Sequence, residues 1–300
     1  MTRRGLLLFI AMCLIWGIPY LFIRIAVSEL SPATLVFLRT GIAALVLLPI
    51  AIRRGGMRAL LDKWRALLVF ALIEIGVPWL ALASAEQQIS SSLAGLLISA
   101  VPLVGVVIAP LFGNRERFGP VNLAGLLLGL IGVSAIVGFD LRTTGWIPLA
   151  EMAVVAICYA VGPAILSRYL SGLPSVSVIA ASLAVCAIVY APLAAFQLPR
   201  TVPSSGVVVS VGVLALVCTA LAFLIFFALI AAIGAVRATV ITYINPAVAA
   251  LAGILVLNEK FTAGMGIGFV LVLLGSTLAT RRSIRRQPAL IEEGVGAGDR

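Results

Sequence analysis

The sequence predicts an all-α integral membrane protein with ten transmembrane helices in two inverted five-helix repeats around a central cavity. Three observations support this fold class: composition, segment length and internal similarity. Hydrophobic residues make up 62% and charged residues 11% of the 300 residues, whereas soluble domains average roughly 45–50% apolar and about 25% charged residues. The composition excludes collagen-like, disulfide-scaffold and disordered chains.

Ten apolar segments are each about as long as the roughly 20 residues that a helix needs to cross a bilayer. The N-terminal segment is too long for a signal peptide and lacks a clean cleavage site, so we expect a retained first helix. Polar and turn residues separate the segments, and the tail at 283–300 is expected to be disordered. The segments cover residues 5–27, 32–52, 65–85, 90–113, 119–139, 146–169, 174–197, 205–231, 237–257 and 262–281.

The net charge of +10 is interpreted as a record of topology, because basic residues accumulate at the cytoplasmic ends of membrane helices. With alternating crossings, 16 of the 21 basic residues fall on the side of the N-terminus. Only Arg142, Arg200 and Lys260 fall on the other side. Both termini are therefore expected in the cytoplasm, in a plasma (inner) membrane, and no nucleic-acid partner is expected.

The residues that commonly carry catalysis are sparse in this chain. It has no histidine, and its four cysteines lie inside apolar runs without a CxxC pair, so no metal site is expected. It has no P-loop, and no Ser, Cys or Asp lies beside a candidate base. We therefore expect neither an enzyme nor a cofactor.

The two halves repeat at a spacing of 143 residues. Gly125 matches Gly268 and Gly132 matches Gly275 at this spacing, and the loop Arg115-Glu116-Arg117 parallels Asn258-Glu259-Lys260. Each half has five crossings, so the second half must enter the membrane from the opposite side. Inverted repeats of this kind build secondary transporters. The predicted repeats are residues 1–140 and 146–282.

Together with Trp16-Gly17 and the helices holding Pro102 and Pro246, these motifs make the chain resemble the drug/metabolite transporter superfamily. The similarity is to its ten-helix branch with two EamA-type repeats, which includes YddG-like exporters of amino acids and related metabolites. The resemblance implies a plasma-membrane exporter with a cavity lined by helices 1, 3, 4, 6, 8 and 9. Cys158-Tyr159-Ala160 replaces the Trp-Gly pair in the second half.

Glu74 is the sharpest candidate for a site residue, because it lies near the middle of an apolar segment. An intramembrane carboxylate costs at least ~2.5–3.5 kcal/mol and is therefore a candidate for function. Glu74 could bind a substrate ammonium or carry a coupled proton, or it could form a structural hydrogen bond. Arg24 is a candidate carboxylate clamp, and Arg39 is expected to be structural.

The other candidates are aromatic, polar and proline residues inside the segments. Each has a structural alternative, either packing between helices or placement at the membrane interface. A stripe of Phe223, Phe226 and Phe227 is more typical of lipid-facing or core positions. The expected substrate-binding residues are Trp16, Tyr20, Arg24, Glu74, Trp79, Ser99, Tyr159, Tyr243 and Asn245, and the expected helix kinks are Pro19, Pro102, Pro163 and Pro246.

The sequence thus favours a secondary transporter that exports small metabolites, with amino acids, aromatic or neutral, as the first candidates. The alternative is a membrane-embedded enzyme of lipid metabolism or a channel, although no polar cluster or charged ring typical of these occurs. Glu116 and Glu259 are expected to act locally, between the last two helices of each half. Small-residue motifs in segments 5 and 10 fit either a monomer or a homodimer.

Overall fold

The computed structural model describes residues 2–112, 119–138, 145–199 and 201–280. Every element in these ranges is helical. Eight helical stretches are long and apolar enough to cross a bilayer, and two shorter apolar helices follow them. The prediction of an all-helical membrane protein with about ten crossings is confirmed. The loop at 113–118, which holds Glu116, and the predicted tail at 283–300 lie outside the described residues.

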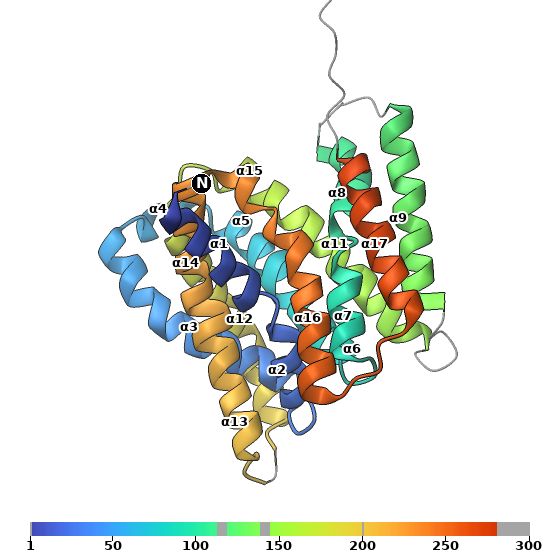
Figure 1. The fold of residues 1–300 in the computed structure, drawn as a ribbon. Coiled ribbons are helices and arrows are strands. Elements are labelled where there is room, and N and C mark those ends of the chain that lie inside the picture. The colour runs from blue at the N-terminus through green and yellow to red at the C-terminus, as the bar shows by residue number, and fades with distance from the viewer. Residues whose placement is uncertain (1, 113–118, 139–144, 200, 281–300) are drawn as a thin grey trace, which may run out of the picture.

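The colours of Figure 1 follow the crossings along the chain, from blue at the N-terminus to red at the C-terminus. In the first half they are α1 (Arg3–Ile15) with α2 (Pro19–Ala26), α3 (Pro32–Arg54), α5 (Trp64–Ala71) with η1 (Leu72–Gly76) and α6 (Val77–Ala85), α7 (Ser91–Ile98) with α8 (Val101–Ile108) and η2 (Ala109–Phe112), and α9 (Pro120–Gly138). In the second half they are α11 (Trp146–Tyr169), α12 (Ser175–Phe196), α13 (Ser205–Gly212) with η3 (Val213–Leu221) and α14 (Ala222–Ile233), α16 (Ile241–Leu257) and α17 (Ala263–Ala279). Two short helices, α4 (Met57–Asp62) and α15 (Ala235–Ala238), were not predicted.

Two of the four predicted proline kinks interrupt a helix. The first crossing breaks just before Pro19, and the fourth breaks just before Pro102. Proline lacks an N–H group and its ring clashes with the preceding turn, so it is tolerated best at the start of a new helix. In contrast, α11 and α16 run continuously through Pro163 and Pro246.

The third crossing of each half contains a π-helical segment, η1 in the first half and η3 in the second. The two segments overlap when the halves are aligned at the 143-residue spacing. π-Helical turns are rare and occur frequently at functional sites. These π-helical segments were not predicted, because their residues are as apolar as those of the regular helices on either side.

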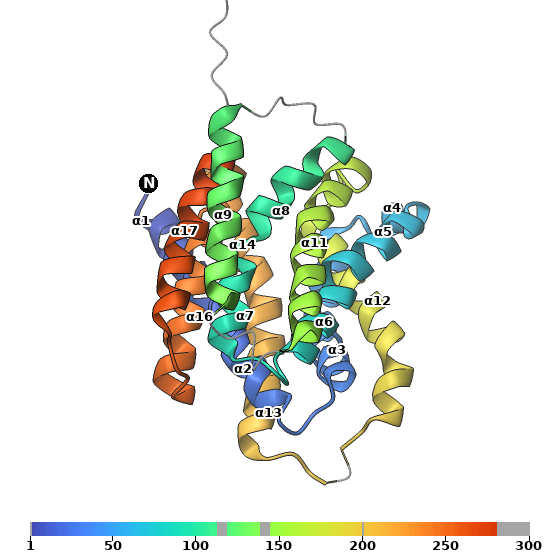
Figure 2. The ribbon, with the colours of Figure 1, turned by 90° about the vertical axis from the view of Figure 1, so that its right-hand side faces the viewer.

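Close contact between α9 and α17 depends on glycine. A Cβ atom on Gly125 would lie 2.8 Å from the carbonyl oxygen of Gly275, and one on Gly132 would lie 2.7 Å from that of Gly268. Residue number therefore rises along one helix as it falls along the other, so the helices are antiparallel and lie side by side (Figures 1 and 2). Gly125 contacts Gly275, the counterpart of Gly132 in the second half. Gly132 contacts Gly268, the counterpart of Gly125. Such reciprocity requires a two-fold relation between the halves.

The pair α3 and α12 repeats this reciprocity with hydrogen bonds. Thr34 Oγ1 donates to the main-chain oxygen of Gln197 (3.3 Å), and Ser177 Oγ donates to that of Gly55 (2.9 Å). Thr34 and Ser177 are 143 residues apart, and each bonds to the C-terminal cap of the other helix. The repeats are thus inverted, as predicted, and each helix of these pairs packs against its own counterpart.

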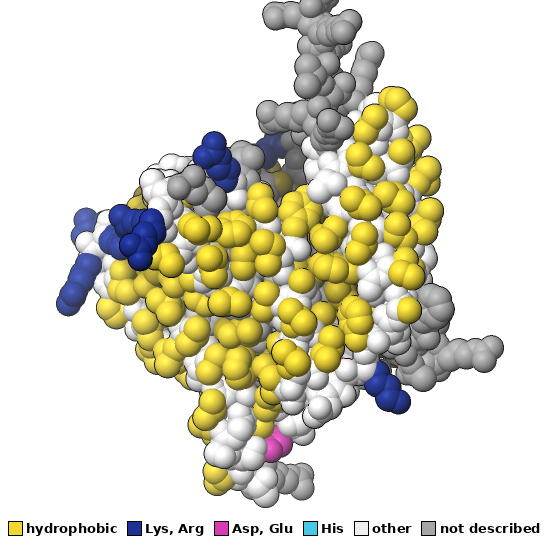
Figure 3. Space-filling view, in the orientation of Figure 1, with side chains coloured by type: hydrophobic (Ala, Val, Ile, Leu, Met, Phe, Trp, Pro, Cys, Tyr) yellow, Lys and Arg dark blue, Asp and Glu magenta, His cyan; other side chains and the backbone are white. Residues whose placement is uncertain are grey.

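The outer surface of the bundle is apolar (Figure 3). Large side chains such as Leu45, Phe196 and Leu255 are 74%, 89% and 76% exposed. An apolar surface of this extent is unfavourable in water, and it fits contact with lipid. Most of the Lys and Arg side chains visible in Figure 3 lie at the end of the molecule that holds the N-terminus.

The glycine contact between α9 and α17 predicts how stability responds to a single methyl group. We expect Gly132→Ala to lower the free energy of unfolding by about 1–3 kcal/mol, because the new Cβ would press on the backbone of α17. Thermal unfolding in detergent measures the change. Gly105→Ala in α8 is the matched control, since a Cβ there meets nothing within 4 Å. Equal melting temperatures for the two variants would contradict this packing.

Candidate functional site

Arg39 of α3 is a buried cation, with only 7% of its surface exposed. Its Nε donates to Thr219 Oγ1 of η3 (2.9 Å), and its guanidinium carbon lies 3.7 Å from the centroid of the Trp79 ring of α6. Neither partner is charged. A desolvated guanidinium over a Trp ring contributes about 2 kcal/mol, far less than a buried charge costs without a counter-charge. Arg39 is therefore positioned to attract an anion.

Thr219 connects this cation to the π-helical segment of the eighth crossing. Its hydroxyl accepts the hydrogen bond from Arg39 and donates to the main-chain oxygen of Leu214 (2.7 Å), five residues earlier. The two bonds hold the guanidinium against η3. A change in the winding of η3 would therefore move Arg39 as well.

Two tyrosines extend the cluster around Arg39. Tyr159 of α11 is hydrogen-bonded to Trp79 and interacts electrostatically with both Arg39 and Glu74. Tyr20 of α2, 8% exposed, lies near Tyr159, Glu86 and Arg39. The cluster thus combines side chains from the first, second, third, sixth and eighth crossings, drawn from both halves.

Glu74 lies on η1 and packs against α11. One of its carboxyl oxygens, Oε2, is buried and has no hydrogen-bond partner among the described residues. This carboxyl group contacts Gly162 so closely that any Cβ there would collide with it. A buried carboxyl oxygen without a partner is unfavourable, so Glu74 is available to a proton or to an ammonium group.

The structure brings four of the predicted binding residues together: Tyr20, Glu74, Trp79 and Tyr159. Arg39 joins them, although a structural role was expected for it. The signal that could have identified it is an arginine seven residues inside an apolar segment, where intramembrane charge is expensive and marks function. Thr219 carried no signal in the sequence, because its role depends on which helix faces it.

Trp16 lies in a different place, within an aromatic group formed with α14. Its ring centroid is 4.7 Å from that of Phe226 and 5.9 Å from that of Phe223. Trp16 caps the end of α1, whereas Tyr20 lies in α2, after the break in the first crossing. The predicted phenylalanine stripe therefore serves as a packing surface for Trp16.

The remaining predicted residues bond to the fold itself. Ser99 Oγ donates to the main-chain oxygen of Leu96 (2.5 Å), and the Arg24 guanidinium donates to that of Glu86. The Asn245 amide, in the orientation that satisfies both its groups, donates to the main-chain oxygens of Cys13 (3.2 Å) and Ile241 (3.0 Å). Tyr243 lies on α16, which packs chiefly against α1, α2 and α7.

Glu259 joins the two halves of the molecule. It accepts hydrogen bonds from the main-chain N–H groups of Ser91 and Ser92 (both 2.8 Å) and from their hydroxyls (3.0 and 2.5 Å). A carboxylate stabilises a helix N-terminus by charge and by hydrogen bonding. The expectation of a local role was wrong for Glu259, since the helix it caps, α7, belongs to the other half.

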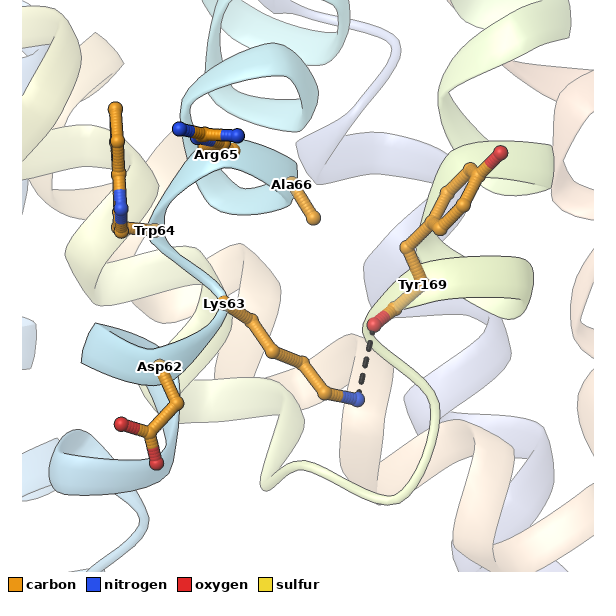
Figure 4. Close-up of a pocket in the computed structure, with 6 residues that line it drawn as sticks. All are labelled: Asp62, Lys63, Trp64, Arg65, Ala66 and Tyr169. Carbon is orange, nitrogen blue, oxygen red and sulfur yellow. Dashed lines mark hydrogen bonds between the residues drawn. The ribbon is translucent and has the colours of Figure 1, made fainter.

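A separate surface groove of about 510 Å³ lies where α5 begins and α11 ends (Figure 4). Lys63 Nζ donates to the main-chain oxygen of Tyr169 across it (3.0 Å), and Arg65 lies beside the Trp64 ring. Basic and aromatic side chains at helix ends are typical of the membrane interface. None of the residues that line this groove belongs to the cluster around Arg39.

Comparison with known proteins identifies relatives of the whole chain. The model of the EamA-like transporter family matches twice, over residues 3–138 and 146–281. The chain is 29% identical to YedA of Escherichia coli K12, named an uncharacterized inner membrane transporter, over 81% of this chain and 79% of that protein. It is 30% identical to a transporter of Archaeoglobus fulgidus, over 89% of this chain and 95% of the other.

A third relative and a solved structure extend these similarities. The transporter YvbV of Bacillus subtilis 168 is 24% identical, over 97% of this chain and 95% of its own. One crystal structure covers 93% of this chain and 97% of its own chain with a TM-score of 0.66, at 22% identity. At that identity the likeness shows a shared fold.

The bonds to Glu259 predict a measurable coupling between the halves. We expect Glu259→Gln to lower the free energy of unfolding by about 1–3 kcal/mol, because it weakens or removes hydrogen bonds made by a charged acceptor. Thermal unfolding of this variant, of Ser92→Ala and of the double variant completes a double-mutant cycle. Lys260→Ala, at an exposed neighbouring position, is the control. Purely additive effects in the cycle would show that the contact contributes nothing.

Proposed function

The chain belongs to the EamA-like transporter family, and we propose that it exports a small zwitterionic metabolite, with amino acids as the first candidates. In this proposal the substrate binds between Arg39 and Glu74. The two halves then expose the site to each side of the membrane in turn. The relatives named as transporters favour transport over catalysis.

The observation that carries the proposal is that Tyr159 lies near both Arg39 and Glu74. The hydrogen-bond and ring partners of Arg39 are neutral, and among the described residues one buried oxygen of Glu74 has no hydrogen-bond partner. A guanidinium binds a carboxylate with a bidentate fork, and a carboxylate accepts hydrogen bonds from an ammonium group. A zwitterion would therefore supply the partner that each side chain lacks.

The aromatic side chains of the cluster favour an apolar substituent on this zwitterion. The Trp79 ring packs against Arg39, and the buried Tyr20 and Tyr159 lie near the same guanidinium. Aromatic rings bury large apolar area, and tyrosine and tryptophan also offer polar groups. Neutral or aromatic amino acids match this combination.

The irregular helices support a mechanism of alternating access. A π-helix lies in the third crossing of both halves, and η1 and η3 hold Glu74 and Thr219 respectively. Interrupted helices next to a central site are typical of transporters with inverted repeats. Rewinding of either segment would change the distance between the two charges, and would therefore couple binding to the conformation of each half.

We also propose that both termini face the cytoplasm of an inner (plasma) membrane. The gathering of Lys and Arg at the N-terminal end supports this orientation (Figure 3), and the relative YedA is named an inner membrane transporter. Proton coupling through Glu74 is part of the same proposal. An acid in the transport path can exchange a proton for the substrate ammonium.

Counterflow in proteoliposomes with a panel of amino acids tests the proposal. We expect Arg39→Gln and Glu74→Gln each to lower the initial flux of the best substrate by at least tenfold, since each loses a charged partner worth more than about 1.4 kcal/mol. Arg65→Gln, at the exposed end of the third crossing, is the control and should transport normally.

A pH series in the same liposomes tests the proton-carrying role of Glu74. The parent flux should change with pH, and the residual flux of Glu74→Gln should not. Normal flux in both charge variants would refute the proposed site. A channel would instead give flux without counterflow, because it has no binding site that must carry substrate back across the membrane.

A further inference from the structure

Glu86 is a second acid that the sequence did not single out. It follows the last residue of α6, its side chain is 0% exposed, and neither of its carboxyl oxygens has a hydrogen-bond partner among the described residues. The Arg24 guanidinium bonds to the main-chain oxygen of Glu86, so it does not satisfy the carboxyl group. Glu86 is thus the most completely enclosed acid described in this molecule.

The charged and titratable groups around Glu86 come from three elements. They are Tyr20 and Arg24 of α2, Arg39 of α3, and Glu259 before α17. Glu259, which accepts hydrogen bonds from Ser91 and Ser92, opposes a second negative charge at Glu86. An ionised carboxylate without hydrogen bonds is also unfavourable in a dry interior. Burial and the nearby Glu259 carboxyl group therefore favour the protonated form of Glu86, against the opposing effect of Arg24 and Arg39.

The position of Glu86 links this proton to closure of one end of the molecule. Glu86 lies among residues that are packed out of contact with solvent where α2 and α6 end: Val27, Leu30, Ala85 and Ile89 are at most 6% exposed. A site that alternates between the two sides must open here at one stage of its cycle. Opening would bring water to the carboxyl group, which would then ionise and be free to pair with Arg24.

We propose that Glu86 is a proton-binding site that operates this end of the transporter. Closure takes up one proton from water to form an O–H bond on a Glu86 carboxyl oxygen, and opening returns the same proton to water. The ratio of open to closed molecules then rises with pH, by at most tenfold per pH unit for a single proton. The proposal rests on the proposed function only in requiring that this end opens.

The test measures opening directly and needs no substrate. Ile89→Cys places a thiol at a position that is 3% exposed, and Gln88→Cys places one at an exposed neighbour. Purified protein in nanodiscs is labelled with a maleimide from pH 5.5 to 8.5. The ratio of the Ile89→Cys rate to the Gln88→Cys rate cancels the pH dependence of the thiol reaction. The four native cysteines are buried, and protein without a reporter corrects for them.

We expect the labelling ratio to rise several-fold between pH 5.5 and 8.5 and to become low and constant in Glu86→Gln, which mimics the protonated acid. Glu29→Gln should keep the rise, because hydrogen bonds from Ser204 hold the pKa of Glu29 below its usual value and therefore below this pH window. Arg24→Gln removes the partner of the ionised form and should move the rise to higher pH, which gives a second readout if Glu86→Gln folds poorly.

Two outcomes would overturn the proposal. They are a labelling ratio that is constant in the parent protein and a rise that persists unchanged in folded Glu86→Gln. Replacing sodium by potassium should change nothing, and a ratio that follows sodium rather than pH would assign the site to a metal cation. Loss of flux in the counterflow assay with a normal labelling profile would count against the proposed substrate. It would not count against the proposed proton site at Glu86.

Discussion

The reciprocal packing of each helix against its own counterpart is the constraint on which the rest of this structure depends. In water, burial of apolar surface would hold such helices together. In a bilayer the lipid tails are as apolar as the helices, so association requires close packing and hydrogen bonds. Gly125 and Gly132 allow α9 and α17 to approach, and the hydroxyls of Thr34 and Ser177 join α3 and α12. Neither half can make these contacts alone.

This pairing places the polar side chains where the halves meet. Arg39 reaches Thr219 of the second half, Glu74 rests on Gly162 of α11, and Glu259 caps α7 of the first half. Each of these contacts crosses between the repeats. A movement of one half against the other must therefore break or rearrange them, which makes them sensitive to the conformation of the molecule. The charged groups are few, and nearly all that are buried lie in this region.

Much of the fold was predictable because membrane crossings have a strong local signal. Apolar length located ten helices, the 143-residue spacing located the repeats, and Pro19 and Pro102 marked two real interruptions. The π-helical segments had no such signal, since their residues are as apolar as those of the regular helices around them. Pro163 and Pro246 had a signal in the sequence, yet α11 and α16 continue through them. Neighbouring helices can support a helix that continues through proline.

The candidate site was predictable only in part, since burial alone does not say which helices face each other. Glu74 stood out as an acid in an apolar segment, and Tyr159 as the residue that takes the place of Trp16 in the second half. Arg39 was expected to be structural, and only the positions of Thr219 and Trp79 assign it to the candidate site. Glu86 looked like a loop residue for the same reason, because the segments that enclose it are distant in sequence.

The central claim is that one cation and one acid bind the two ends of a zwitterion. Isothermal titration of purified protein with three matched ligands tests it most directly: the amino acid that gives the largest counterflow, its decarboxylated amine and its deaminated acid. The account predicts that the amino acid binds at least tenfold more tightly than either analogue, because each analogue leaves Arg39 or Glu74 without its partner. Equal or tighter binding of the amine or the acid would contradict it.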